Sequence, residues 1–308
     1  MKDAEYRAAP GLSNSAMKDL AVSPLRYWHR HLNPEAPVIE PSAEMQMGSA
    51  VHCAILEPAE FDNRYVCEFI PPDDVLDTMD DLREFIRSKG KIPKGTRKDE
   101  VIAQVQFIDP TAPILAVLVP KHEAQHAGKT ILKADDWHRI AGMSKALLDE
   151  PHVQRILAGA KTEVVIFGKD QETGTVLKGK LDVWQDEYTA DIKTFSAREG
   201  QSIDQCVGRE ILYRSYYRQA YFYSLLRGWP DFNGPFVMPF VESEEPHEVR
   251  IRELSAGDNL YWKRAALEVR NLIRTYAECM EHFGPDKPWR YAQDVVPLRD
   301  EELPGMGW

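Results

Sequence analysis

The sequence predicts an α/β protein with a central mixed sheet flanked by helices. Residues 163–194 alternate short apolar runs with turn-forming segments at 170–174 and 185–187, a pattern typical of three consecutive antiparallel strands. Helical periodicity precedes and follows these strands, in 128–159 and in 255–284. Strands bracketed by amphipathic helices indicate a sheet with helices packed on it.

The N-terminal part, residues 1–67, is expected to be helical. Residues 47–56 follow helical spacing, and Gly48 and His52 lie four apart on a stripe beside the apolar one. Gly48 is predicted to let this helix approach another backbone closely, so that His52 points into a site as a metal ligand. The alternative for His52 is a core or surface histidine without a special role.

Residues 68–135 are predicted to be an insertion. Two short helical patterns, 82–86 and 100–105, are joined by a connection rich in glycine, proline and lysine. The segment 79–106 resembles SAP-type helix-extended-helix modules, which bind DNA. In that interpretation its basic side chains contact phosphates, namely Lys89, Lys91, Lys94, Arg97 and Lys98. The equal alternative is a solvated surface hairpin.

The core is assigned to residues 136–284, and its strands carry the most informative side chains. Two amphipathic helices broken near Pro151 lead into the first strand, which Glu163 opens. Strand alternation puts Asp182 on one face of the second strand, together with Lys178, Lys180 and Trp184.

The same period puts Asp191 and Lys193 together, so neighbouring strands would bring both close to Asp182. Two carboxylates can share a hard cation, and a lysine beside them can act on an attacking water. The alternative is a pair of solvated strand-edge acids, with Lys193 as protection against edge pairing.

Residues 205–229 are predicted to form one helix, in which Gln219 and Tyr223 lie one turn apart. Gln219 can donate to and accept from a phosphate or a bound water, and Tyr223 can hydrogen-bond the same neighbourhood. The other tyrosines are assigned to core packing. Basic residues beside the expected site are candidate DNA contacts: Lys178, Lys180, Arg209, Arg214 and Arg218. Residues 236–243 predict a further strand, and the proline-rich tail 285–308 is expected to be irregular, either loose or packed on a neighbouring subunit.

Composition and charge exclude several classes of protein and leave a nucleic-acid role open. The formal net charge of −11 opposes general nucleic-acid affinity, although metal-site acids contribute to it and a basic channel can coexist with acidic outer faces. The four cysteines are scattered, which argues against zinc, a disulfide framework and an iron–sulfur cluster. No segment predicts a signal peptide or a membrane span, so a cytoplasmic location is expected.

Five separated segments together resemble the RecE-type (exonuclease VIII) nuclease domain of the PD-(D/E)XK superfamily, found in phages and prophages. They are residues 11–28, 47–61 with its GxxxH pattern, Glu163, 180–194, and 218–226 with its QxxxY pattern. The resemblance implies Mg²⁺, with Mn²⁺ as a substitute, held by His52, Glu163, Asp182, Asp191 and the main-chain carbonyl of Ile192. It also implies that Lys193 orients or deprotonates the attacking water, while Gln219 and Tyr223 position the scissile group.

The resemblance further implies the substrate and partners. The implied reaction is processive 5′-to-3′ digestion of linear double-stranded DNA, which leaves a 3′ overhang. The implied partner is a RecT-like single-strand annealing protein, and the implied assembly is a ring-shaped homo-oligomer, a tetramer in preference to a trimer. The insertion at 68–135 departs from the family pattern. Two alternatives stay open: an endonuclease or structure-specific nuclease on the same core, and a catalytically idle DNA-binding or assembly protein.

Overall fold

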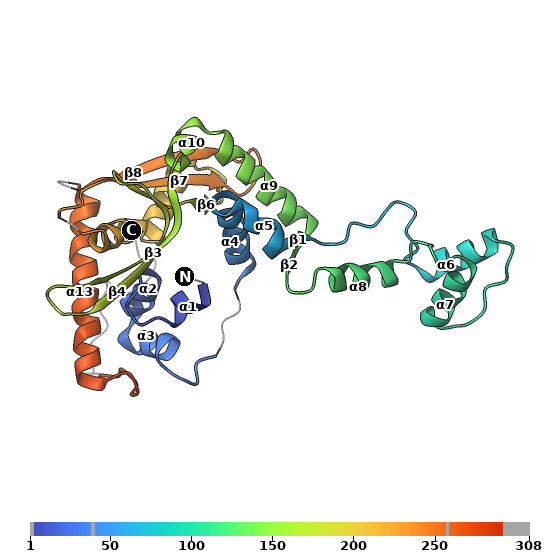
Figure 1. The fold of residues 1–308 in the computed structure, drawn as a ribbon, viewed down its shortest axis with the longest axis horizontal. Coiled ribbons are helices and arrows are strands. Elements are labelled where there is room, and N and C mark those ends of the chain that lie inside the picture. Colours follow the sequence, from blue (N-terminus) through green and yellow to red (C-terminus); the bar gives the residue numbers. More distant parts are fainter. Residues whose placement is uncertain (1–2, 38–40, 229, 257–258, 292–308) are drawn as a thin grey trace.

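The computed structural model describes residues 3–37, 41–228, 230–256 and 259–291. Its centre is a six-stranded mixed sheet, as predicted, with helices along its sides (Figure 1). The strands are β3 (Lys161–Lys169), β4 (Val176–Trp184), β5 (Thr189–Ala190), β6 (Lys193–Phe195), β7 (Phe236–Glu242) and β8 (Val249–Leu254).

Strands β3, β4 and β5 form the predicted antiparallel series. Strand β7, predicted over 236–243, runs parallel to both β5 and β6. It pairs antiparallel with β8, a strand that the sequence analysis did not predict. Because β5 pairs with the start of β7 and β6 with its end, β5 and β6 are two halves of one strand. The interruption falls at Asp191 and Ile192, where the candidate chemistry lies.

Two apolar clusters hold the helices to the sheet. The first joins β4 and β7 to α2 (Asn14–Val22), α3 (Pro24–His31), α11 (Ile203–Tyr213), α12 (Tyr216–Leu226) and α13 (Leu260–Phe283). The second joins the sheet to α4 (Ala43–Leu56), α9 (Ala134–Asp149) and α10 (Pro151–Leu157). Figure 1 shows α13 along one side of the sheet and α4 and α9 along the other. The short helices α1 (Asp3–Ala8) and α5 (Pro58–Arg64) complete the body.

The insertion forms an arm that extends away from this body (Figure 1). At its base, β1 (Tyr65–Cys67) pairs in parallel with β2 (Thr130–Leu132). The arm carries α6 (Met79–Ser88) and α7 (Lys98–Ile108), where two helices were predicted, and α8 (Leu115–Gln125), which was not. The far end of the arm has an apolar core of its own, made of Leu82, Ile86, Val101, Val105 and Ile114.

Two predictions about helices are corrected. The single helix expected over 205–229 is two helices, because the chain breaks at Ser215, whose φ of 55° is left-handed. A β-carbon added to Gly48 would meet no atom within 4 Å, so this glycine does not permit a close backbone approach.

The start of the C-terminal tail packs on its own chain. Trp289 is buried, stacks on Tyr27 of α3, and donates its ring N–H to the carbonyl of Gly284. Residues 292–308, the remainder of the predicted irregular tail, lie outside the described residues. In the described part of the chain, no helix combines the length and the apolar character that a membrane crossing requires.

Candidate metal centre

Glu163 and Asp182 face each other across two neighbouring strands. The register pairs Thr162 with Val183 and Val164 with Leu181, so Glu163 stands opposite Asp182 and their side chains share a face. Glu163 has a left-handed φ of 55°, which costs about 1 to 3 kcal/mol in a residue with a side chain. Backbone strain of this kind concentrates at functional sites, where the surrounding structure holds it in place.

His52 completes a set of three side chains that could hold a metal ion. Helix α4 buries Ala50, Val51 and Ile55 in the second apolar cluster, which turns His52 towards β4. Its Nδ1 lies 3.2 Å from Oδ2 of Asp182. One ligand atom each from His52, Glu163 and Asp182 lie within 4.8 Å of one another.

These three side chains fit a small divalent cation. Bonds of about 2.1 Å to Mg²⁺ place neighbouring donor atoms of an octahedron about 3 Å apart and opposite ones about 4.2 Å apart. Donor atoms within 4.8 Å of one another are therefore close enough to move onto one ion. Their donor atoms, two carboxylate oxygens and one imidazole nitrogen, also suit Mn²⁺.

The interruption between β5 and β6 serves this site directly. The backbone N–H of Asp191 donates to the carbonyl of Val237, 3.0 Å away, and keeps the strand attached to β7. The next N–H, that of Ile192, donates to Oδ2 of Asp182 at 2.9 Å. A main-chain donor is thereby fixed on the carboxylate that also contacts His52.

Asp191 is buried and held from two sides. Gln219 on α12 donates from its side-chain nitrogen to Oδ1 of Asp191, 2.7 Å away, and Lys193 forms an ion pair with Oδ2. Asp191 is not part of the three-residue set, so its place among the metal ligands stays a prediction, as does that of the Ile192 carbonyl. Tyr223, one turn beyond Gln219, donates to the carbonyl of Lys180 at 3.0 Å and fastens α12 to β4.

Mutual interactions set the protonation of these groups. Burial opposes the charge on His52, but Asp182 outweighs it and raises the pKa of His52 to about 9. Burial also opposes ionisation of Asp182, yet His52 and Lys193 lower its pKa. Burial, and then the neighbouring Asp182, raise the pKa of Asp191. The site therefore concentrates perturbed groups, as catalytic centres do.

Glu163 and Lys193 complete this electrostatic arrangement. Burial raises the pKa of Glu163, and Lys180, which forms an ion pair with it, offsets this only in part. Burial disfavours the charge on Lys193, but Asp191 outweighs it and the pKa of Lys193 is raised. Lys193 therefore stays protonated in this arrangement.

The sequence analysis missed Lys18, which lies beside the site. The Nζ atoms of Lys18 and Lys193 approach the same ring, that of Tyr216, at 5.8 and 4.5 Å from its centroid. Lys18 is exposed on α2, but the surrounding protein partly desolvates its amine. This desolvation, then the charges of Lys193 and Arg218, lower the pKa of Lys18 to about 8. Among the described residues Lys18 forms no ion pair. Only its position inside the segment 11–28 could have drawn attention to it.

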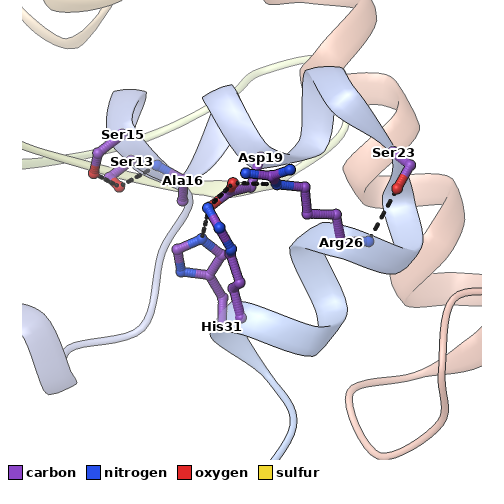
Figure 2. A network of polar contacts seen from close by, with 8 residues as sticks. Ser13, Ser15, Ala16, Asp19, Ser23, Arg26 and His31 are labelled. Carbon is purple, nitrogen blue, oxygen red and sulfur yellow. Dashed lines mark hydrogen bonds and ion pairs between the residues drawn. The ribbon is translucent and has the colours of Figure 1, made fainter. Parts of the chain in front are cut away.

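The neighbouring Asp19 fixes the helix that carries Lys18. Its carboxylate accepts hydrogen bonds from Arg26 at 2.9 Å, Arg30 at 2.6 Å and His31 at 3.0 Å, which joins α2 to α3 (Figure 2). Ser13 caps the start of α2 by accepting from the N–H of Ala16. These contacts fix the helix from which Lys18 approaches Tyr216.

The two lysines predicted to contact DNA from β4 have different partners in the structure. Lys178 is buried and donates to the carbonyls of Tyr6, Arg7 and Ala9 at the end of α1, at 3.0, 3.1 and 2.5 Å. It holds the N-terminal helix on β4, so its amine faces main-chain carbonyls and not a DNA phosphate, contrary to the prediction. Lys180 pairs with Glu163 inside the site.

Three arginines were also predicted to contact DNA. Arg209 lies on α11, Arg214 follows the end of α11, and Arg218 lies on α12. Arg214 pairs with Glu210 at 3.2 Å and Arg218 with Glu268 at 3.7 Å. Arg209 is partly buried on α11. Their contacts with DNA remain predictions.

For the nuclease activity that the sequence resemblance implies, replacing Lys18 by methionine is expected to raise KM for duplex DNA about tenfold and to lower kcat less, because a cation beside the site contributes to holding a phosphate. Lys18→Arg should retain most of the affinity. Steady-state cleavage rates over a range of DNA concentrations measure both constants. Lys145→Met on α9, which removes an exposed lysine, is the matched control. Equal KM values for Lys18→Met and the control would contradict a substrate contact.

Comparison with known proteins identifies the family of this chain. No match was found among curated protein sequences. A candidate exonuclease from Eubacterium rectale has a similar structure, with a TM-score of 0.54, 14% identity, and 96% of each chain covered. A second structure, of the protein SSO0001, is only weakly similar, with a TM-score of 0.28 at 12% identity over 77% of this chain and 87% of that one. The family model described as a PDDEXK-like domain of unknown function (DUF3799) matches residues 13–288. The chain belongs to this PDDEXK-like family.

Proposed function

We propose that the protein is a metal-dependent exodeoxyribonuclease that digests linear double-stranded DNA 5′-to-3′ and leaves a 3′ single-stranded overhang. The observation that carries hydrolysis is the meeting of His52, Glu163 and Asp182 within 4.8 Å, beside a strand interruption that presents Asp191 and Lys193. Membership of the PDDEXK-like family supports the same reaction class.

Each side chain has a role in this proposal. His52, Glu163 and Asp182 would hold Mg²⁺ or Mn²⁺, and a bound divalent cation neutralises phosphate charge and activates water. Lys193, fixed by Asp191, stands where a protonated amine can orient the attacking water or stabilise charge on the phosphate. Gln219 keeps the Asp191 carboxylate in place, and Lys18 would contact a phosphate next to the scissile one.

The finer features of the proposal rest on similarity. The five segments that resemble RecE-type nucleases support digestion from 5′ ends, and the Eubacterium rectale structure is described as that of a candidate exonuclease. By the same resemblance we propose a RecT-like annealing protein as the recipient of the overhang and a closed ring, a tetramer in preference to a trimer, as the assembly.

End-labelled duplex DNA tests the polarity. With Mg²⁺ present, a label at one 5′ end should appear early as mononucleotide, while a label at the 3′ end of the same strand is released late. Early release of the 3′ label would reverse the polarity, and internal cuts that precede the release of either label would favour an endonuclease.

Metal binding is expected to release a proton and to strengthen as pH rises. The pKa of His52 is about 9 in the metal-free protein, and a protonated imidazole cannot bind a metal. Affinity for Mn²⁺ should therefore rise up to about tenfold per pH unit below pH 9 and level off above it. Calorimetric titrations in buffers of different ionisation enthalpy count the protons released.

The raised pKa of His52 also makes the folding stability of the metal-free protein depend on pH. The pKa of His52 is raised above its ordinary value of 6.5, so the stability from its pairing with Asp182 is fully present below pH 6.5 and is lost as pH rises through about 9. A His52→Gln variant should lose both pH dependences. Proton release that is identical in this variant and in the wild type would rule out His52 as a ligand.

A further inference from the structure

We infer that the far end of the arm is a second DNA-binding surface, which holds the duplex outside the catalytic site through Arg87, Lys91 and Lys94. This inference rests on the proposed function for its ligand, double-stranded DNA. Its evidence comes from the arm alone: a basic stretch of sequence, cations that form no ion pair among the described residues, and a connection fixed by side chains of α7.

One stretch of the arm is unusually basic for this chain. Residues 87–98 contain six lysines and arginines and no acidic residue, in a protein whose formal net charge is −11. This stretch covers the end of α6, the connection between the helices, and the start of α7. A local cluster of positive charge on an acidic protein attracts a polyanion to that place.

The structure separates these six cations into two groups. Three have carboxylate partners, in the ion pairs Lys89 with Asp109, Arg97 with Asp99, and Lys98 with Asp77. The other three, Arg87, Lys91 and Lys94, are exposed and form no ion pair among the described residues. We therefore expect phosphate contacts first at Arg87, Lys91 and Lys94. The sequence interpretation included Lys91 and Lys94 without distinguishing them from their neighbours, and it omitted Arg87.

The connection that carries these cations is held in one conformation. The side chain of Gln104 on α7 accepts from the N–H of Lys94 at 2.8 Å and donates to the carbonyl of Ile92 at 2.9 Å. Glu100 accepts from the N–H of Thr96 at 3.1 Å. Gly95 has a φ of 94°, and a β-carbon there would lie 2.7 Å from the Glu100 carboxylate, so the turn requires glycine.

A fixed connection on a small core gives the cations a lasting arrangement. The buried residues Leu82, Ile86, Val101 and Val105 pack α6 against α7 beneath it. Charges placed on an ordered surface contact phosphates without the entropy loss that ordering a loose loop would cost. The position of this surface at the end of the arm (Figure 1) separates it from the catalytic site.

The test compares two triple variants of the full chain. Arg87→Gln with Lys91→Gln and Lys94→Gln removes the proposed contacts. Arg155→Gln with Lys169→Gln and Lys287→Gln removes three exposed cations of the body, none of which has an ion pair among the described residues. Fluorescence anisotropy of a long labelled duplex, with EDTA to prevent cleavage, gives the affinity at several salt concentrations.

The arm variant should bind the long duplex about tenfold more weakly, and the slope of log affinity against log salt should become shallower by about 0.9 for each phosphate that is no longer neutralised. The body variant should match the wild type. Equal slopes in the two variants would overturn the inference, as would a changed oligomeric mass in the arm variant with unchanged DNA affinity, which would assign the surface to a protein contact.

Cleavage of a short duplex with Mg²⁺ separates this inference from the proposed function. The arm variant should cleave the short duplex as the wild type does, because the catalytic residues are untouched. Absence of cleavage by all three proteins contradicts the nuclease proposal while the anisotropy data still decide the arm. Normal cleavage combined with equal salt slopes contradicts the arm inference alone.

Discussion

Asp182→Asn is expected to reduce kcat for duplex cleavage at least about 10³-fold, which corresponds to about 4 kcal/mol of transition-state stabilisation. Asp182 accepts from the Ile192 N–H, contacts His52 and stands opposite Glu163. The amide keeps the shape of the carboxylate but loses its charge, so it also weakens metal binding. Calorimetry with Mn²⁺ and a cleavage assay measure the two effects on the same preparation.

Asp186→Asn is the matched control for this change. Asp186 is exposed in the turn that follows β4, so the same loss of one carboxylate there should leave metal affinity and rate as in the wild type. If Asp182→Asn binds Mn²⁺ as tightly as this control does, the three-residue set is not the metal site.

Lys193→Met is expected to lower kcat about 10³-fold, within the range for loss of a group that transfers or holds a proton, while metal binding is not weakened. Lys193 contacts Asp191 and the ring of Tyr216 and is not among the three proposed metal ligands. This separation of rate from metal affinity distinguishes it from Asp182. Single-turnover cleavage at saturating metal isolates the chemical step.

Two further variants make the role of Lys193 specific. Lys193→Arg keeps the charge but changes the shape and the acidity of the group, so partial recovery of the rate would assign Lys193 an electrostatic role and no recovery a proton-transfer role. Lys169→Met, at the exposed end of β3, controls for the loss of a lysine. A rate for Lys193→Met within a few-fold of this control would contradict any catalytic role.

The sequence predicts those parts of the site that strand periodicity determines. Alternation with period two places Asp182 on one strand and Asp191 with Lys193 on the next, and the observed register of β3, β4 and β5 agrees with it. Helical spacing likewise placed Gln219 and Tyr223 on one face of α12. Both patterns depend on local geometry alone.

Three features could not be predicted from the sequence: the helix break at Ser215, the burial of Lys178 and the position of Lys18 beside the site. The break at Ser215 has no glycine or proline to mark it, although it sets the direction of α12. The burial of Lys178 depends on α1, which lies about 170 residues earlier in the chain. Lys18 approaches the site because Asp19 joins α2 to α3. Contacts between distant segments leave no periodic pattern in any one of them.

The most direct test of the central claim is incubation of the purified protein with linear duplex DNA and with a covalently closed circle, with Mg²⁺ or with EDTA. The account predicts that the linear duplex is degraded to mononucleotides only with Mg²⁺, that the circle stays intact, and that Asp191→Ala degrades neither. Cleavage of the circle would contradict the exonuclease assignment, and failure to hydrolyse either DNA with Mg²⁺ would contradict the nuclease assignment altogether.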